Sequence, residues 1–335
     1  MFPYFCAGVY FSQPLFVLGE VGIAALFAVL IQKKEASSWQ MIFVWLSQPS
    51  YAISFWSYFW IPIIILFRWL FCGDVQILYY DILLPVVLGS WGCLWTFLTQ
   101  QHISIHRIGE KGIRVVHLSD IHASPVMRGI ELDALVEKVN HLMPDIVVIT
   151  GDWVMPFSEE EHSYLFRSLR SVKAPIVGAM GNHDLPIQAR FVQEAKCEGI
   201  HLLIDDAVSF DINGCTLWIA GLQFHWRGAK IACLDTLRSF VQEIVDYRII
   251  LAHDPRYFQW IPETAADMVL SGHTHGGQLA LNMFGIPWSP LRLLGVYDQG
   301  WFWKGEQRLY VHKGNWIWGL PPRMGVAPEI ALFLL

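Results

Sequence analysis

Charged residues are scarce in this sequence. They make up 16% of its 335 residues, whereas a typical soluble domain has about 25%. The shortage is concentrated in residues 1–100, which hold seven of the 23 basic and 29 acidic side chains. This excludes a single water-soluble fold over the whole length. We predict a membrane region over residues 1–100, a linker over 101–112 and a water-soluble domain over 113–335.

The sequence also lacks a basic surplus and closely paired cysteines. Its net charge of −6 offers no basic face for nucleic acid, so we expect no nucleic-acid partner. The six cysteines are scattered, which excludes a disulfide framework and a zinc knuckle. No segment of the sequence indicates a protein partner.

Three long apolar segments lie within the first hundred residues: Pro14–Ile31, Met41–Cys72 and Gln76–Leu98. A helix needs about 20 apolar residues to cross a bilayer, so we expect about three N-terminal transmembrane helices. A cleavable signal peptide is rejected because no basic region precedes the first segment and Glu20 lies inside it. Prolines within the later segments leave a re-entrant element open.

The basic residues around these segments predict an orientation. Lys33 and Lys34 follow the first segment, while Arg107, Lys111 and Arg114 follow the third. Three crossings place both groups on one side, and basic residues favour the cytoplasmic side. We therefore expect a protein of the inner (cytoplasmic) membrane whose water-soluble domain faces the cytoplasm.

From residue 113 onward, short apolar runs rich in β-branched residues alternate with amphipathic segments. Such runs are typical of buried strands, and the amphipathic segments are typical of helices. The expected strands are Ile113–Leu118, Ile146–Thr150, Ile176–Met180, Leu217–Ala220, Ile249–Ala252, Met268–Leu270, Leu309–His312 and Ile330–Leu335. The expected helices are Glu131–Leu142, Glu159–Arg170 and Ile187–Cys197. The fold class is therefore α/β, with sheet covered on both sides and a mixed or antiparallel edge.

Polar side chains follow five of the expected strands. They are Asp120 and His122, Asp152, Asn182 with His183 and Asp184, His253, and finally His273 and His275. Ligands in α/β folds bind beyond the carboxyl ends of the strands. Five loops therefore bring carboxylate, amide and imidazole groups to one edge of the sheet.

These residue types indicate a metal site. The candidate ligands are Asp120, His122, Asp152, Asn182, His253, His273 and His275. A set without thiolate suits Mn²⁺, Fe or Zn²⁺ better than calcium. Seven ligands exceed one tetrahedral site but fit two ions that share a carboxylate. Such a pair, about 3.5–4 Å apart, can assist a phosphoryl displacement and lower the pKa of bound water. We expect two divalent ions, Mn²⁺ first, with Mg²⁺, Fe and Zn²⁺ as alternatives.

The order of these motifs resembles a known family. Asp-x-His at 120–122, Gly-Asp at 151–152, Gly-Asn-His-Asp at 181–184, a lone His253 and Gly-His-x-His at 272–275 are similar to the motifs of the calcineurin-like metallophosphoesterases. The resemblance implies a β-sandwich flanked by helices and a phosphohydrolase activity. It also implies the roles of individual residues.

One metal ion would take Asp120, His122 and His275, and the other would take Asn182, His253 and His273. Asp152 would bridge the two ions. His183 would contact the phosphate and stabilise or protonate the leaving group, and Asp184 would orient the His183 ring. Asn182 is also expected to contact the substrate.

The C-terminal residues and the apolar N-terminus resemble one branch of this family more than others. Gly314, Arg323 and Pro328-Glu329-Ile330 are similar to a membrane-associated branch, most of all to the pyrophosphatases of lipid A biosynthesis. This implies a lipid-linked nucleotide-sugar substrate, UDP-2,3-diacylglucosamine, cleaved to UMP and 2,3-diacylglucosamine 1-phosphate. The alternative is a phosphodiesterase or phosphatase acting on another membrane lipid or cell-envelope intermediate. A scaffold or transporter with a degenerate domain is disfavoured by the intact ligand set.

Several other residues are candidates for substrate binding. Arg323 and His225 could reach the substrate. The apolar segments Met283–Trp288 and Leu291–Val296 are equally compatible with a lipid-contacting surface, with core, and with a docking face for the membrane helices. The sequence departs from common relatives at Trp153 and at Lys313–Trp316.

Overall fold

The computed structural model describes residues 101–124, 127, 129–155, 160–240, 244–316 and 323–335, together with positions 66, 69, 70 and 99. The chain divides into two compact units, Met1–Leu94 and Trp95–Leu335. Apart from positions 66, 69 and 70, the predicted membrane segments lie outside the described residues. Among the residues that are described, no helix is both long and apolar enough to span a membrane.

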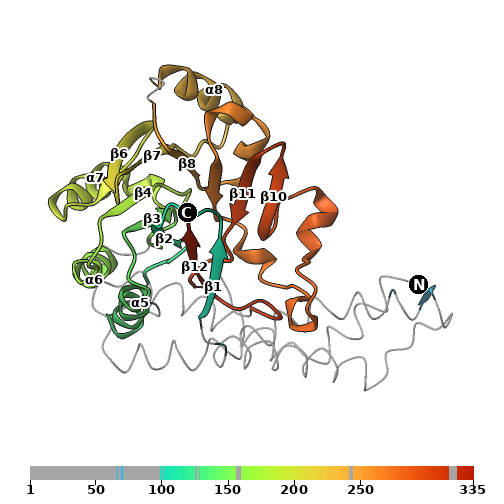
Figure 1. The fold of residues 1–335 in the computed structure, drawn as a ribbon. Helices are drawn as coiled ribbons and strands as arrows, with labels where there is room; N and C mark the ends of the chain where they lie inside the picture. The colour runs from blue at the N-terminus through green and yellow to red at the C-terminus, as the bar shows by residue number, and fades with distance from the viewer. Residues whose placement is uncertain are drawn as a thin grey trace. The chain divides into compact units, whose positions relative to one another are not determined.

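The second unit contains two six-stranded sheets (Figure 1). The first sheet has the order β1-β12-β2-β3-β4-β5. Its strands are β1 (His102–Arg107), β2 (Arg114–Leu118), β3 (Ile146–Thr150), β4 (Ile176–Ala179), β5 (His201–Leu202) and β12 (Glu329–Leu334). The neighbours from β2 to β5 pair in parallel, whereas β12 pairs antiparallel to β2 and parallel to β1.

The second sheet has the order β10-β11-β9-β8-β7-β6. Its strands are β6 (Asp206–Ile212), β7 (Cys215–Leu222), β8 (Tyr247–Ala252), β9 (Met268–Ser271), β10 (Gly300–Lys304) and β11 (Gln307–Val311). The four inner strands β7, β8, β9 and β11 run parallel to one another. Each edge strand, β6 and β10, is antiparallel to its neighbour, so the sequence expectation of mixed edges is confirmed.

The two sheets pack face to face, and helices cover their outer faces. Val148 and Val177 of the first sheet and Ile249 and Leu270 of the second belong to the apolar core between the sheets. Successive residues of a strand point to opposite faces, so the neighbours of these residues face outward. A second core lies between the first sheet and the helices α5 (Gly129–His141), α6 (Glu160–Leu169) and α7 (Gln188–Cys197). A third lies under α8 (Ala229–Ser239) and the short helix η2 (Pro255–Gln259).

This layered arrangement positions the polar loops. β2, β3 and β4 run parallel in one sheet, and β8 and β9 run parallel in the other. The carboxyl ends of parallel strands meet at the same edge of a sheet. In each sheet the loops that carry the predicted ligands therefore lie next to one another.

The predicted linker is partly wrong, because residues 102–107 form β1 at the edge of the first sheet. Every backbone register pair of β1 is with β12, from His102–Glu329 to Arg107–Leu334. β1 is thus held by a strand more than two hundred residues away. The structure also adds β6, β10 and α8, which the apolar periodicity does not predict.

Candidate metal centre

Asp120 and His122 lie directly after β2, on a loop that runs beside the Asp152 loop. The backbone N–H of Asp120 donates to the carbonyl of Gly151, and that of His122 donates to the carbonyl of Asp152. Both residues have positive φ, 52° and 47°, a conformation that L-residues adopt rarely. The two buried side chains are thereby turned toward the ends of the neighbouring strands.

Asp152 follows β3 after a single glycine, and the backbone of Gly181 packs against its carboxylate. A Cβ atom at Gly181 would lie 2.1 Å from Asp152 Oδ1, so only glycine fits there. The same oxygen accepts a hydrogen bond from the backbone N–H of His183 at 2.9 Å. The close approach of these two loops therefore requires glycine at position 181.

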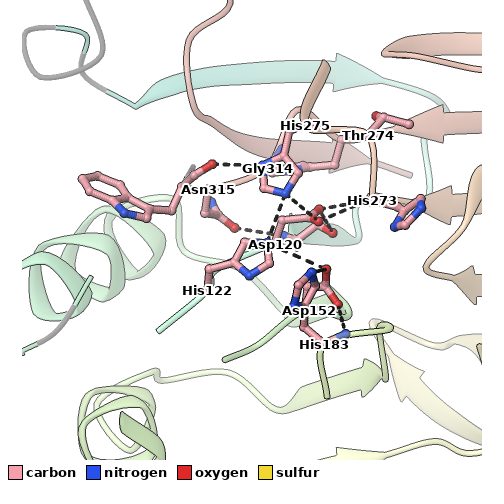
Figure 2. A network of polar contacts seen from close by, with 12 residues as sticks. Asp120, His122, Asp152, His183, His273, Thr274, His275, Gly314 and Asn315 are labelled. Atoms are coloured by element: carbon pink, nitrogen blue, oxygen red, sulfur yellow. Dashed lines mark hydrogen bonds and ion pairs between the residues drawn. The ribbon is translucent and has the colours of Figure 1, made fainter. Parts of the chain in front are cut away.

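His273 and His275 follow β9, the second of them in the short helix η4 (His275–Gly277). The backbone N–H of His273 donates to both carboxylate oxygens of Asp120 at 3.1 Å. This contact links the second sheet to the first at the edge where the loops meet. Figure 2 shows the Asp120 carboxylate between the His273 and His275 residues.

The candidate ligands fall into two groups. Asp120, His122 and His275 form one, and Asp152, His253 and His273 form the other; within each group the potential ligand atoms lie within 4.8 Å of one another. Asp152 lies between the groups, because its Oδ2 atom is 3.3 Å from His253 Nε2 and 3.7 Å from His122 Nε2. This is the arrangement that a bridging carboxylate requires, with the ligands of the first group as the resemblance implies.

The orientation of the imidazoles fits metal ions. His122 Nε2 and His275 Nε2 face each other at 3.1 Å, and His273 Nδ1 faces His253 Nε2 at 3.2 Å. Paired ring nitrogens that point at a common space, together with two buried carboxylates, form the donor set of a dinuclear site. Asn182 Oδ1 joins the second group, at 3.2 Å from His253 Nε2.

The charges at the site also favour cations. Burial lowers the pKa of His122 to about 3 and that of His273 to about 4, so both rings are neutral at pH 7, as metal ligands must be. Burial alone would raise the pKa of Asp120, but the neighbouring His275 lowers it well below its usual range. Burial of His253 is outweighed by Asp152, which raises the pKa of His253 to about 10. An incoming ion must therefore displace a proton there.

His183 lies at the open side of the two groups. Its side chain is 19% exposed, whereas that of Asp152 is 3% exposed, and its Nε2 atom is 4.0 Å from Asp152 Oδ2. Its ring packs edge to face against His122. Burial lowers the pKa of His183, and Asp152 acts in the opposite direction. His183 is thus both accessible and adjacent to the ligands.

Asp184 joins two of the loops at the site through backbone hydrogen bonds. This buried carboxylate accepts hydrogen bonds from the backbone N–H groups of Asp152, Trp153 and Gly181 at 2.8–2.9 Å, and from Val154 at 3.4 Å. It therefore holds the loop after β3 against the loop after β4. Asp184 thus positions the Asp152 backbone, and its predicted role in orienting the His183 ring stays a prediction.

Arg323 differs most from the sequence expectation. Its side chain is 1% exposed, and its guanidinium donates to the carbonyl oxygens of Gly314, Trp316 and His275 as well as Lys313. A buried group with this many carbonyl partners is not available to a substrate. Arg323 instead joins the η4 loop to residues 313–316, so we correct its predicted role to a structural one.

Replacing Arg323 by methionine should lower the free energy of unfolding by at least about 3 kcal/mol, because each buried carbonyl left without a donor costs about 1–3 kcal/mol. Thermal unfolding of the purified full-length chain measures this. Arg238→Met is the control, since Arg238 and its partner Asp235 are both exposed, at 75% and 64%, where such a pair contributes about 0–1 kcal/mol. An unchanged unfolding midpoint with a raised KM would restore Arg323 as a substrate contact.

His225 lies on the loop between β7 and α8, beside the second ligand group. Its backbone N–H donates to Tyr257 Oη, and the preceding residue, Phe224, packs against the rings of His253 and His273. No described contact ties His225 to the candidate ligands. Its predicted role in substrate binding therefore stays a prediction.

The structure adds a supporting network that sequence reasoning missed. Ser119 Oγ donates to Asp120 Oδ2 at 2.6 Å, and the backbone N–H of Ser119 donates to Asn315 Oδ1 at 2.9 Å. Asn315 in turn donates to the carbonyl of Glu329, at the start of β12. The Lys313–Trp316 departure noted in the sequence thus supplies a side chain that holds the Asp120 loop. Trp153, the other departure, is fully buried and donates to the carbonyl of Ala179.

Comparison with known proteins agrees with this geometry. Residues 113–277 match the family model described as calcineurin-like phosphoesterase, a range that contains all seven candidate ligands. The uncharacterized metallophosphoesterase YkuE of Bacillus subtilis is 29% identical over 242 residues, which cover 68% of this chain and 80% of that protein. The phosphodiesterase YaeI of Escherichia coli is 26% identical over 250 residues, 72% of this chain and 88% of that protein.

A third relative, from Bos taurus, is named a transmembrane protein with metallophosphoesterase domain. It is 27% identical over 276 residues, and these cover 71% of this chain but only 56% of that protein. The matched range and the names of these relatives agree with a metallophosphoesterase domain. The chain is therefore a metal-dependent phosphoester hydrolase, and its residues 113–277 are similar to the calcineurin-like metallophosphoesterases.

Proposed function

We propose that this chain hydrolyses a phosphoester or pyrophosphate bond of a membrane lipid, with UDP-2,3-diacylglucosamine as the first candidate substrate. The observation that carries the proposal is the pair of ligand groups with an accessible histidine beside them, in a chain whose first hundred residues are nearly free of charge. Cleavage of this substrate would give UMP and 2,3-diacylglucosamine 1-phosphate.

In the proposed reaction, the metal ions and the side chains around them would have different roles. Bound divalent ions supply Lewis acidity at phosphoryl oxygens and lower the pKa of water. Asp120 and Asp152 would provide the negative charge that holds two cations close together. His183 would contact the phosphate and give a proton to the leaving oxygen; its ring lies beside Asp152 and reaches solvent, which supports this role. Asn182, half-buried beside His253, would orient the same phosphate.

A phosphodiester or phosphomonoester of another membrane lipid is the second candidate. The relative YaeI is named a phosphodiesterase, which favours a diester over a nucleoside diphosphate. The ligand groups serve either bond equally well, because both reactions displace an oxygen from phosphorus. The substrate assay below separates the two.

The proposal includes a place in the cell. Membrane anchoring through residues 1–100, with the hydrolase domain in the cytoplasm, follows from the apolar segments and from the distribution of basic residues. The Bos taurus relative, named a transmembrane protein, supports anchoring. The inner membrane would present lipid-linked substrates to the domain directly.

Metal removal and a substrate panel test the function. We expect full-length protein to contain about two divalent ions per chain, to lose activity with a chelator, and to recover it best with Mn²⁺ among Mn²⁺, Mg²⁺, Fe²⁺ and Zn²⁺. The panel compares UDP-2,3-diacylglucosamine, UDP-N-acetylglucosamine, a phospholipid diester and bis(p-nitrophenyl) phosphate.

The panel has three informative outcomes. UMP release that requires the acyl chains supports the first candidate. Hydrolysis of the phospholipid without any UMP release overturns the first candidate and supports the second. Equal rates on lipid-linked and soluble esters would contradict a lipid substrate altogether, and chelator-resistant activity would contradict the metal site.

A further inference from the structure

The segment between η4 and β10, residues 279–297, forms two short turns next to the ligand loop. They are η5 (Asn282–Phe284) and η6 (Pro290–Leu294), drawn in orange ahead of β10 in Figure 1. We call them the apolar turns. The family match ends at residue 277, directly before this segment. The apolar turns therefore lie just outside the range that the family model matches.

The base of the apolar turns is fixed by buried polar contacts. Asp298 is fully buried and accepts from the backbone and hydroxyl of Ser289, at 3.0 and 2.9 Å, and from Arg292 Nε at 2.7 Å. The carbonyl of Asp298 accepts from Thr274 Oγ1 at 2.6 Å, between the two ligand histidines. A Cβ atom at Gly277 would also lie 2.6 Å from Ser289. The turns are thus joined tightly to the loop that carries His273 and His275.

The tips of the apolar turns are exposed and hydrophobic. The exposed fractions are 69% for Phe284, 51% for Ile286, and 77% for both Leu293 and Leu294. Trp303, on the neighbouring strand β10, is 64% exposed. Between residues 279 and 297 the sequence holds one charged side chain, Arg292, and Asp298 neutralises it. A hydrophobic surface without free charge, held by a rigid base, is a contact surface rather than a solvated loop.

We infer that the apolar turns enter the lipid surface of a bilayer beside the metal centre, so that the substrate's phosphate reaches the ligands from the lipid side. The chain outside the described residues favours a bilayer over a protein partner. Its last apolar segment ends at Leu98, and β1 begins at His102. Even fully extended, the chain between these two residues spans only about 14 Å.

The inference rests on the proposed function for the identity of the substrate, but the membrane contact can be tested separately. Leu294→Cys, in full-length protein with its native cysteines replaced by alanine, would carry the fluorophore NBD. The protein is reconstituted into vesicles of phosphatidylethanolamine and phosphatidylglycerol. Ile231→Cys is the matched control, because Ile231 on α8 is 68% exposed but lies outside the apolar turns.

At position 294 we expect NBD emission to shift to shorter wavelength in vesicles and quenching by aqueous iodide to fall about fivefold relative to position 231, since a buried apolar site excludes water. Equal quenching at the two positions would overturn the inference. So would protection at 294 that persists in detergent together with a doubled particle mass, since that outcome identifies a second copy of the chain as the partner.

A catalytic comparison tests the route of the substrate. Leu294→Ser should lower hydrolysis of the vesicle-borne lipid ester by about tenfold, the effect of losing one buried leucine, and leave hydrolysis of bis(p-nitrophenyl) phosphate unchanged. Ile231→Ser should change neither rate. Equal vesicle rates for the two variants would overturn the lipid-side route. Failure of the unaltered chain to hydrolyse any ester would instead contradict the proposed function, and the NBD result would still decide the membrane contact.

Discussion

Asp152→Asn should lower the hydrolysis rate by about 10³-fold or more and reduce the metal content below two ions per chain. The carboxylate lies between the two ligand groups, 3.3 Å from His253 Nε2 and 3.7 Å from His122 Nε2. Asparagine keeps the oxygen that accepts from the His183 N–H but loses the charge that holds two cations. Metal catalysis contributes several kcal/mol to phosphoryl transfer, and each 1.36 kcal/mol is a factor of ten.

Elemental analysis and the rate with bis(p-nitrophenyl) phosphate measure both effects. Asp254→Asn is the control, because Asp254 is equally buried and directly follows His253. Its carboxylate caps η2 and pairs with Arg256, and it is not among the ligands. This variant should retain about two ions per chain. Equal metal content in the two variants would remove Asp152 from the centre.

His183→Ala should keep both ions but lose about 10²–10⁴-fold in rate, the usual contribution of a positioned proton donor. The His183 ring touches the edge of the first ligand group and reaches solvent, and it belongs to neither group. Single-turnover hydrolysis with a series of leaving groups is the measurement. The loss should be largest for alcohols that leave poorly and smallest for p-nitrophenol, which needs no proton.

His201→Ala is the matched variant for this experiment, since His201 is exposed on β5 at the far edge of the first sheet. Its rate should equal that of the unaltered chain. A uniform loss for all leaving groups in His183→Ala would point to phosphate binding as the role of His183. An unchanged rate would exclude this residue from the reaction.

The central strands were predictable because their continuous apolar sequences are compatible only with burial on both faces of a sheet. The predicted strand Ile146–Thr150 coincides with β3, in which every residue is buried. The predicted helix Ile187–Cys197 differs from α7 by one residue. In both elements the apolar pattern of the chain and its burial in the fold agree, so local sequence suffices.

The edge strands were not predictable in this way. β1 has exposed or half-exposed residues at every position except Ser104, and β6 has no buried residue. Such strands form because a partner strand offers its backbone, and for β1 that partner is β12 at the opposite end of the domain. A pairing across this sequence distance leaves no local pattern, which explains why residues 101–112 read as a linker.

At the metal centre, sequence predicted which residues gather but not what each of them does. The motifs at strand ends brought together both ligand groups. The contacts that Asp184 and Arg323 make were not predictable, because their partners are backbone N–H and carbonyl groups. Every residue except proline carries both groups, so the residue types of the partners do not indicate that the contact forms.

The left-handed backbone of the ligand loops has a consequence for the whole domain. Asp120, His122, Asp152, His273 and His275 all have positive φ, at about 1–2 kcal/mol per residue. Their total is a large part of the 5–15 kcal/mol by which folded domains are typically stable. The packing of the buried strands must therefore stabilise the fold by more than the left-handed backbone of these loops destabilises it. A substitution that makes a cavity in the core, far from any ligand, lowers that stability. It would therefore reduce activity, because the ligand loops could then leave their left-handed conformation.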